Sequence, residues 1–86
     1  MLRAFNRNQL LILSQVAINS GKTISSLLIE IEKGFRIPLS TLKLNARILR
    51  DLKLISFGNS NPARLTSFGK LIIEILDLSN DGRLMS

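Results

Sequence analysis

Cationic side chains are concentrated in the middle of this 86-residue chain, where they can bind a polyanion. The whole sequence holds 12 lysines and arginines against 6 acidic residues, which gives a net charge of +6. Residues 35–70 hold seven of these cations and one carboxylate, Asp51, so this segment alone carries a charge equal to that of the whole chain. Such a local surplus favours nucleic acid as the first candidate partner and an anionic lipid surface as the second.

Several of these cations share one face of a predicted helix over residues 40–53. The buried stripe of this helix is predicted from i, i+4, i+7 spacing and consists of Leu42, Ala46 and Leu49. At about 100° per residue, Lys43 and Arg47 lie about 100° and 140° from Leu42 and therefore outside the stripe. A helix in the major groove of DNA needs this arrangement, because its outer face must bring cations to phosphates and guanine edges. A solvated cationic face is the alternative explanation.

The outer face of this helix provides candidate contacts to DNA. We expect Lys43 and Arg47 to contact bases or nearby phosphates, and Leu44 to meet a thymine methyl group. Ser40 and Thr41 stand at the helix start, where their hydroxyls can donate to a phosphate. The candidate DNA-binding residues on this helix are Ser40, Thr41, Lys43, Leu44, Arg47 and Arg50.

The residue types that the chain lacks exclude most catalytic chemistry. There is no cysteine, which rules out disulfides, thiolate metal ligands and thiol nucleophiles, and no histidine, the commonest metal ligand and usual general base. We therefore expect no catalytic residue, no metal site, no cofactor and no enzymatic activity. Nothing in the sequence suggests a small-molecule ligand.

The sequence also argues against a membrane segment. Its longest uncharged stretch covers residues 8–21 and contains several polar residues, whereas a spanning helix needs about 20 mostly apolar ones. Arg3 and Arg7 before an apolar run resemble the start of a signal peptide, but Ser14 and Gln15 break that run and no small-x-small cleavage site follows. We expect a cytoplasmic protein.

The rest of the chain divides into short elements of one domain, residues 1–78, followed by a polar and disordered tail, residues 79–86. Asn6 followed by Gln9 suggests a capping box at the start of the first helix. In the first half of the chain, the predicted elements are a helix from Asn6 or Asn8 to residues 19–21, a short strand at 22–24, and a helix from Ser25 or Ser26 to about Lys33 that is ended by Gly34. A turn through Pro38 leads to the helix at 40–53. A β-hairpin at 54–66 with its tip at 58–62 follows, and then a helix that is capped by Thr66 and ends near Leu78.

Two segments resemble parts of a known family. Residues 40–55, STLKLNARILRDLKLI, resemble the recognition helix and first wing strand of the MarR- and ArsR-like regulators, and most of all those of small archaeal winged-helix DNA-binding proteins. The step Leu65-Thr66-x-x-Gly69 into a closing helix is the second similar feature, and the likeness covers residues 24–78. Many of the similar proteins carry glycine where Lys53 stands, a larger apolar residue in place of Ala46, and often arginine in place of Leu44.

The resemblance implies a winged helix-turn-helix fold, mainly α with a small β-hairpin, in the order α-β-α-α-β-β-α. In such a fold the hairpin is a wing that can enter the minor groove of DNA. Arg64 alternates with the inward Leu65 and so points outward, while Asn59 and Asn61 stand at the hairpin tip. Asn59, Asn61 and Arg64 are therefore candidate DNA contacts, although the asparagines also match ordinary turn composition.

The first and last helices carry more apolar residues than one buried stripe needs. Exposed apolar patches usually mark interfaces, and the resemblance implies a homodimer built by these two helices. The candidate interface residues are Leu11, Ile12, Ile73 and Leu76. Alternatively, these residues complete a small core from several sides.

Together these features predict a double-stranded DNA-binding protein, either a transcription regulator or a nucleoid-associated protein. The alternative is a winged-helix module that docks onto a protein within a replication or transcription complex. That alternative needs an apolar or mixed face on the recognition helix, and Leu44 and Ile48 are its best support.

Overall fold

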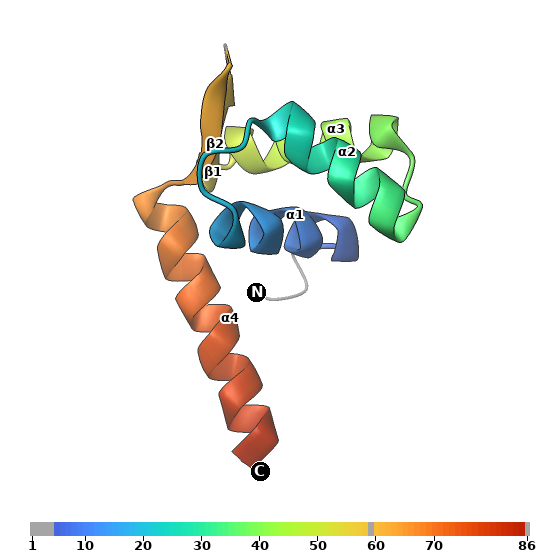
Figure 1. Ribbon diagram of the computed structural model, residues 1–86. Coiled ribbons are helices and arrows are strands. Elements are labelled where there is room, and N and C mark those ends of the chain that lie inside the picture. The colour runs from blue at the N-terminus through green and yellow to red at the C-terminus, as the bar shows by residue number, and fades with distance from the viewer. Residues whose placement is uncertain (1–4, 59, 86) are drawn as a thin grey trace.

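The structure is a computed structural model that describes residues 5–58 and 60–85, with side chains as far as Leu76. Four helices and one β-hairpin make up this part of the chain (Figure 1). The elements in chain order are α1 (Arg7–Ile18), α2 (Ile24–Phe35), α3 (Leu39–Asp51), β1 (Ile55–Gly58), β2 (Asn61–Leu65) and α4 (Ser67–Met85). The predicted class, mainly helical with a small β-hairpin, is confirmed. The order is α-α-α-β-β-α, so the additional strand predicted at residues 22–24 is wrong.

That segment makes only an isolated bridge to the hairpin. Thr23 pairs with Pro62, and the backbone N–H of Ala63 donates to the carbonyl of Lys22 over 2.8 Å. Thr23 is also the N-cap of α2, because its Oγ1 accepts from the N–H of Ser26 at 3.3 Å. The chain must enter the helix immediately after Thr23, so no room remains for a strand, and the predicted caps at Ser25 or Ser26 are displaced by two or three residues.

The start of α1 confirms the predicted capping box. The Asn6 side chain accepts from the N–H of Gln9 at 2.8 Å, and the Gln9 side chain accepts from the N–H of Asn6 at 3.1 Å. After α1 ends, Gly21 takes a φ of 90°, a conformation that glycine adopts without steric cost.

The end of α2 differs from the prediction. Gly34 lies within the helix, and Arg36 takes the left-handed conformation with a φ of 57° while its N–H donates to the carbonyl of Glu32 at 2.8 Å. Pro38 disfavours helical backbone at the residue before it, Ile37. The helix therefore continues past Gly34 and stops shortly before the proline.

The core lies where α1, α2, α3 and the hairpin meet. Each of these helices contributes a buried apolar face, and the predicted stripe of α3 is confirmed. The buried apolar residues are Ile12, Leu13, Val16, Leu27, Leu28, Ile31, Leu42, Ala46, Leu49, Leu54, Ile55, Ala63 and Ile72. Ile12 is 0% exposed, so its assignment to a dimer interface is wrong. The reason is that α1 contacts α2, α3, β2 and α4, and its buried face is wider than one stripe.

The hairpin pairs β1 with β2 in antiparallel register. Ile55 is opposite Leu65 and Ser56 is opposite Arg64, while a bulge between Ser56 and Gly58 changes the register near the tip. Just before β1, Lys53 has a φ of 67°. This left-handed conformation favours glycine, so Lys53 adopts it at a steric cost.

A close contact joins the base of the hairpin to α4. The N–H of Gly69 donates to Oγ1 of Thr66 at 2.9 Å, which confirms Thr66 as the predicted cap. The carbonyl oxygen of Leu54 accepts from both the N–H and Oγ1 of Thr66, at 3.0 and 3.1 Å, and Thr66 Oγ1 also contacts the carbonyl of Lys53. A Cβ on residue 69 would overlap the Leu54 carbonyl. The glycine of the Leu65-Thr66-x-x-Gly69 step is therefore required for this close approach.

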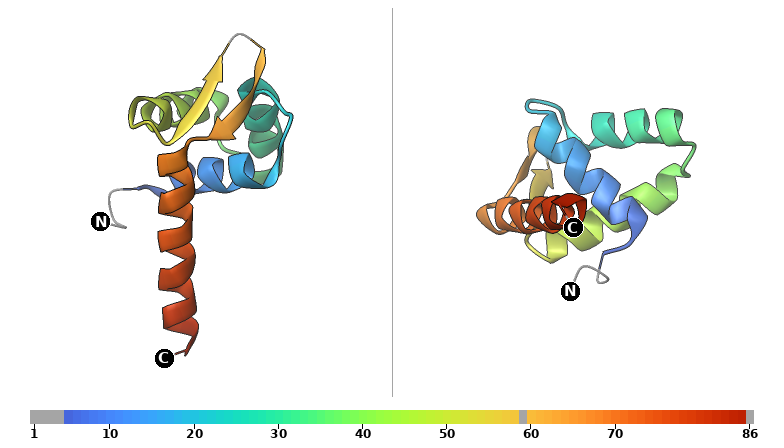
Figure 2. Two further views of the ribbon diagram at one scale, coloured as in Figure 1. Left: turned by 90° about the vertical axis from the view of Figure 1, so that its left-hand side faces the viewer. Right: turned by 90° about the horizontal axis from the view of Figure 1, so that it is seen from below.

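Helix α4 extends away from the other elements (Figures 1 and 2). It continues to Met85, so the predicted end near Leu78 is wrong, and residues 79–85 of the predicted tail are helical. Ser86 lies outside the described residues. The sequence contains no proline after Pro62. Once a helix has begun, each further residue adds a hydrogen bond at low cost, which explains the longer helix.

Candidate nucleic-acid interface

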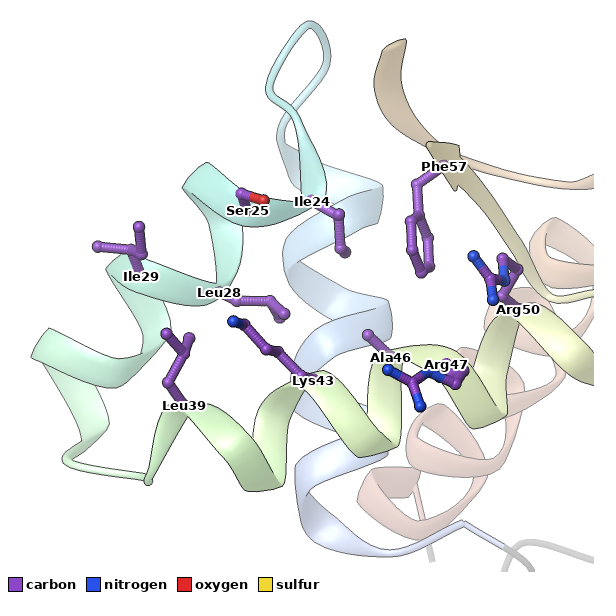
Figure 3. Close-up of a pocket in the computed structure, with 10 residues that line it drawn as sticks. All are labelled: Ile24, Ser25, Leu28, Ile29, Leu39, Lys43, Ala46, Arg47, Arg50 and Phe57. Atoms are coloured by element: carbon purple, nitrogen blue, oxygen red, sulfur yellow. The ribbon is translucent and has the colours of Figure 1, made fainter. Parts of the chain in front are cut away.

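The outer face of α3 carries a row of exposed cations. Lys43, Arg47 and Arg50 follow i, i+4, i+7 spacing and are exposed, and Figure 3 shows all three beside the space between α2 and α3. Within residues 5–58 and 60–76, one ion pair is present, between Lys22 and Glu30 at 2.7 Å. The charges of the α3 row are therefore not neutralised by any described carboxylate.

The hairpin contacts this row through an aromatic ring. The guanidinium carbon of Arg50 lies 4.8 Å from the centroid of the Phe57 ring, which is cation–π geometry. Phe57 is half-buried and stands at the β1 bulge, between the paired residues Ser56 and Gly58. This contact joins the hairpin to α3. Sequence reasoning missed it because a bulge decides which way Phe57 points.

A buried polar network holds the inner side of α3 against α1. Asn45 is 5% exposed, and its Nδ2 donates to the carbonyl of Thr41 at 2.9 Å. Its Oδ1 accepts from Nε2 of Gln9 and from Nδ2 of Asn6, both at 3.1 Å. The capping box of α1 is thus tied directly to the helix that carries the cations. Asn45 was not predicted as important, although an asparagine beside an apolar stripe is a weak signal of such a role.

The start of α3 leaves backbone donors free for a ligand. Its N-cap is Pro38, which has no side chain that can accept from the first-turn N–H groups. Ser40 is exposed and Thr41 is half-buried in this first turn. Leu44 lies on the same outer part of α3 and is 56% exposed. The structure thus brings the predicted α3 residues to the surface, with Thr41 only partly accessible.

The hairpin carries further exposed polar groups. Arg64 and its pairing partner Ser56 are both exposed, as is Asn61 at the start of β2. A shallow depression on the hairpin is lined by Phe57, Asn61 and Arg64 among others, so Phe57 borders both Arg50 and this hairpin surface. Asn59 lies outside the described residues.

The remaining candidate dimer residues are only partly accessible. Leu11, Ile73 and Leu76 are half-buried and pack against the core. The exposed apolar side chains of α4 are instead Phe68 and Leu71, which are 50% and 51% exposed. The sequence does not identify Phe68 and Leu71 as a pair, because it does not reveal which side of α4 faces the core.

The described residues hold neither a metal-binding cluster nor a membrane-spanning helix. No group of three or more acidic side chains is placed to hold a metal ion in the part of the chain that the structure describes. Among the helices described, none combines the length and apolar character needed to cross a membrane.

Comparison with known proteins finds no similar family, curated protein or solved structure at a significant level.

Proposed function

We propose that this protein is a winged helix-turn-helix protein that binds double-stranded DNA, with α3 in the major groove and the β1–β2 hairpin as the wing. The observation that carries the proposal is the unpaired row Lys43, Arg47 and Arg50 on a helix whose apolar stripe is fixed in the core. DNA-binding proteins of this kind place cations on phosphates and present side chains to base edges from one rigid helix.

The neighbouring groups support the same docking. Ser40, Thr41 and the free N–H groups at the start of α3 can donate to a phosphate, while Leu44 can contact a thymine methyl group. On the hairpin, Arg64 and Asn61 are exposed and can reach a minor groove. Such a protein would work in the nucleoid as a transcription regulator or a nucleoid-associated protein.

The second part of the proposal is a homodimer held by α4. Phe68, Leu71 and Ile75 follow the 3,4 spacing of a helix-pairing seam, and the first two are half exposed. The sequence continues the spacing at Leu78. A two-fold pair would present two α3 helices to half-sites about one turn of DNA apart.

The test is binding of a labelled random duplex by fluorescence anisotropy across a salt series. If Lys43, Arg47, Arg50 and Arg64 each neutralise one phosphate, the slope of log K against log salt is about −3.6 per protomer. Affinity then falls about 150-fold between 50 and 200 mM salt. Absence of binding at low salt would contradict the proposal.

Two double variants distinguish the contribution of the α3 row to DNA binding from that of the net charge. Lys43→Ala with Arg47→Ala should reduce the slope to about −1.8. Arg7→Ala with Lys33→Ala removes the same charge from exposed positions on α1 and α2 and should leave the slope close to that of the parent. Equal effects of the two pairs would show that α3 does not carry the contact.

A protein-docking module is the second candidate, and the exposure of Leu44 favours it. If the protein is such a module, the parent should show no salt-dependent binding to DNA. Leu44→Asp should then abolish capture of the protein partner.

A further inference from the structure

A groove between α2 and α3 is not explained by contacts to DNA. It has a volume of about 390 Å³ and ends against Phe57 of β1 (Figure 3). Small-molecule sites have volumes of about 300–1,000 Å³ and mostly apolar linings. The apolar residues that line this groove are Ile24, Leu28, Ile29, Leu39, Ala46 and Phe57.

The polar groups of the groove are almost all cationic. Lys43, Arg47 and Arg50 line it from α3, Ser25 lines it from α2, and no acidic residue is among its lining residues. In Figure 3 the Lys43 side chain extends across the groove toward Leu28, which is almost fully buried. An anion held by Lys43 would therefore lie directly beside an apolar floor.

DNA alone does not satisfy both parts of this surface. Phosphates can pair with Lys43 and Arg47, but a charged backbone gains nothing from apolar side chains such as Ile29, which is 42% exposed. Leaving such side chains in water is unfavourable. The complementary molecule has one anionic head and an apolar tail.

We propose that the α2–α3 groove binds an amphiphilic carboxylate of the fatty-acid type. Its carboxylate pairs with Lys43 and Arg47, and its tail lies over Leu28 and Ile29 on the α2 side of the groove. Because this ligand uses two cations of the α3 row, it excludes DNA from the same face. The exclusion rests on the proposed function, whereas binding in the groove does not.

The direct test is a titration of the isotopically labelled full chain with decanoate below its critical micelle concentration, followed by NMR. The chain has no tryptophan or tyrosine, so methyl and amide signals are better reporters than intrinsic fluorescence. We expect saturable shifts confined to residues that line the groove. Acetate supplies only the head and decyltrimethylammonium only the tail, so each should bind about tenfold more weakly or worse. Equal binding of either control would overturn the proposal.

A substitution that fills the groove provides the matched test. Ser25 is exposed and lines the groove, and the adjacent Ser26 is exposed but does not line it. Ser25→Phe should weaken decanoate binding about tenfold, while Ser26→Phe should leave it unchanged. If Ser25→Phe does not fold, the exposed residue Ile29 offers a second variant, Ile29→Gln, with the same expected loss. Unchanged decanoate affinity in a folded variant would contradict the site.

The charge requirement has its own pair of variants. Lys43→Gln should weaken decanoate binding, and Lys33→Gln, which changes an exposed lysine of α2 outside the groove, should not. Shifts of the groove signals by an acidic amphipathic peptide but not by decanoate would assign the groove to a protein partner and overturn the proposal.

Competition separates the groove from the proposed function. With decanoate at ten times its Kd, mutual exclusion raises the apparent Kd for DNA about elevenfold. An unchanged Kd for DNA would overturn the exclusion. If the protein binds no DNA at all, the proposed function fails, and the NMR titration still decides whether the groove binds a carboxylate.

Discussion

Replacement of Gly69 by alanine tests the close contact between α4 and the hairpin. Gly69 lies in the first turn of α4, and an added Cβ would overlap the carbonyl oxygen of Leu54 and lie 3.0 Å from its carbonyl carbon. These are backbone atoms, so no side-chain rotation can relieve the overlap. The start of α4 must move away from the hairpin.

The size of the effect follows from the hydrogen bonds that this movement stretches. The Leu54 carbonyl accepts one bond from the N–H of Thr66 and shares the Thr66 hydroxyl hydrogen with the Lys53 carbonyl, and Oγ1 of Thr66 accepts one bond from Gly69. Three bonds at about 1 kcal/mol each amount to about 3 kcal/mol, whereas alanine gains about 1 kcal/mol over glycine in a helix. The free energy of unfolding should fall by about 2 kcal/mol, which lowers Tm by about 8–16 °C in a chain of this size.

Gly34→Ala is the matched control. Gly34 lies inside α2, and no neighbouring atom lies within 4 Å of an added Cβ. This change should raise the free energy of unfolding by about 0.5–1 kcal/mol. Thermal and urea unfolding followed by far-UV circular dichroism would measure both variants. If Gly69→Ala raises Tm as Gly34→Ala does, the contact between α4 and Leu54 is not as close as described.

The remaining predictions concern α3, α4 and the junction before β1. Asn45→Ala removes the acceptor of two side-chain amides of the α1 cap and should lower the free energy of unfolding, measured in urea, by about 2 kcal/mol. An unchanged free energy of unfolding would contradict the network. Leu71→Glu should convert the dimer to a monomer in sedimentation equilibrium, and a monomeric parent would refute the proposed dimer. Lys43→Ala with Arg47→Ala should change the free energy of unfolding by no more than about 0.5 kcal/mol, because both side chains are exposed, and a larger loss of stability would mean that they support the fold. Lys53→Gly should raise the free energy of unfolding by about 0.5–1 kcal/mol, since its φ of 67° favours glycine, and a destabilised variant would show that the Lys53 side chain is needed.

Local features of the fold could be predicted from the sequence. The capping box of Asn6 and Gln9 and the cap at Thr66 depend on residues three positions apart, so a short window contains all the information. The buried stripe of α3 follows from its spacing in the same way. The exposed cations of α3 were predictable for this reason.

Features that depend on distant residues could not be predicted. Asn45 acquires its role from Gln9 and Asn6, which lie 36 and 39 positions earlier in the chain. The burial of Ile12 depends on how many elements surround α1. The groove requires Phe57, whose direction is decided by a β-bulge that leaves no clear mark in the sequence.

The close contact at Gly69 couples the direction of α4 to the hairpin. The helix has 19 residues and is therefore about 28 Å long at about 1.5 Å per residue. A tilt of about 5° at its base displaces the far end by about 2.5 Å, which approaches the rise of one base pair, about 3.4 Å. In the proposed homodimer held by α4, the steric fit of one glycine against one carbonyl would thus set how far the two α3 helices can move relative to each other.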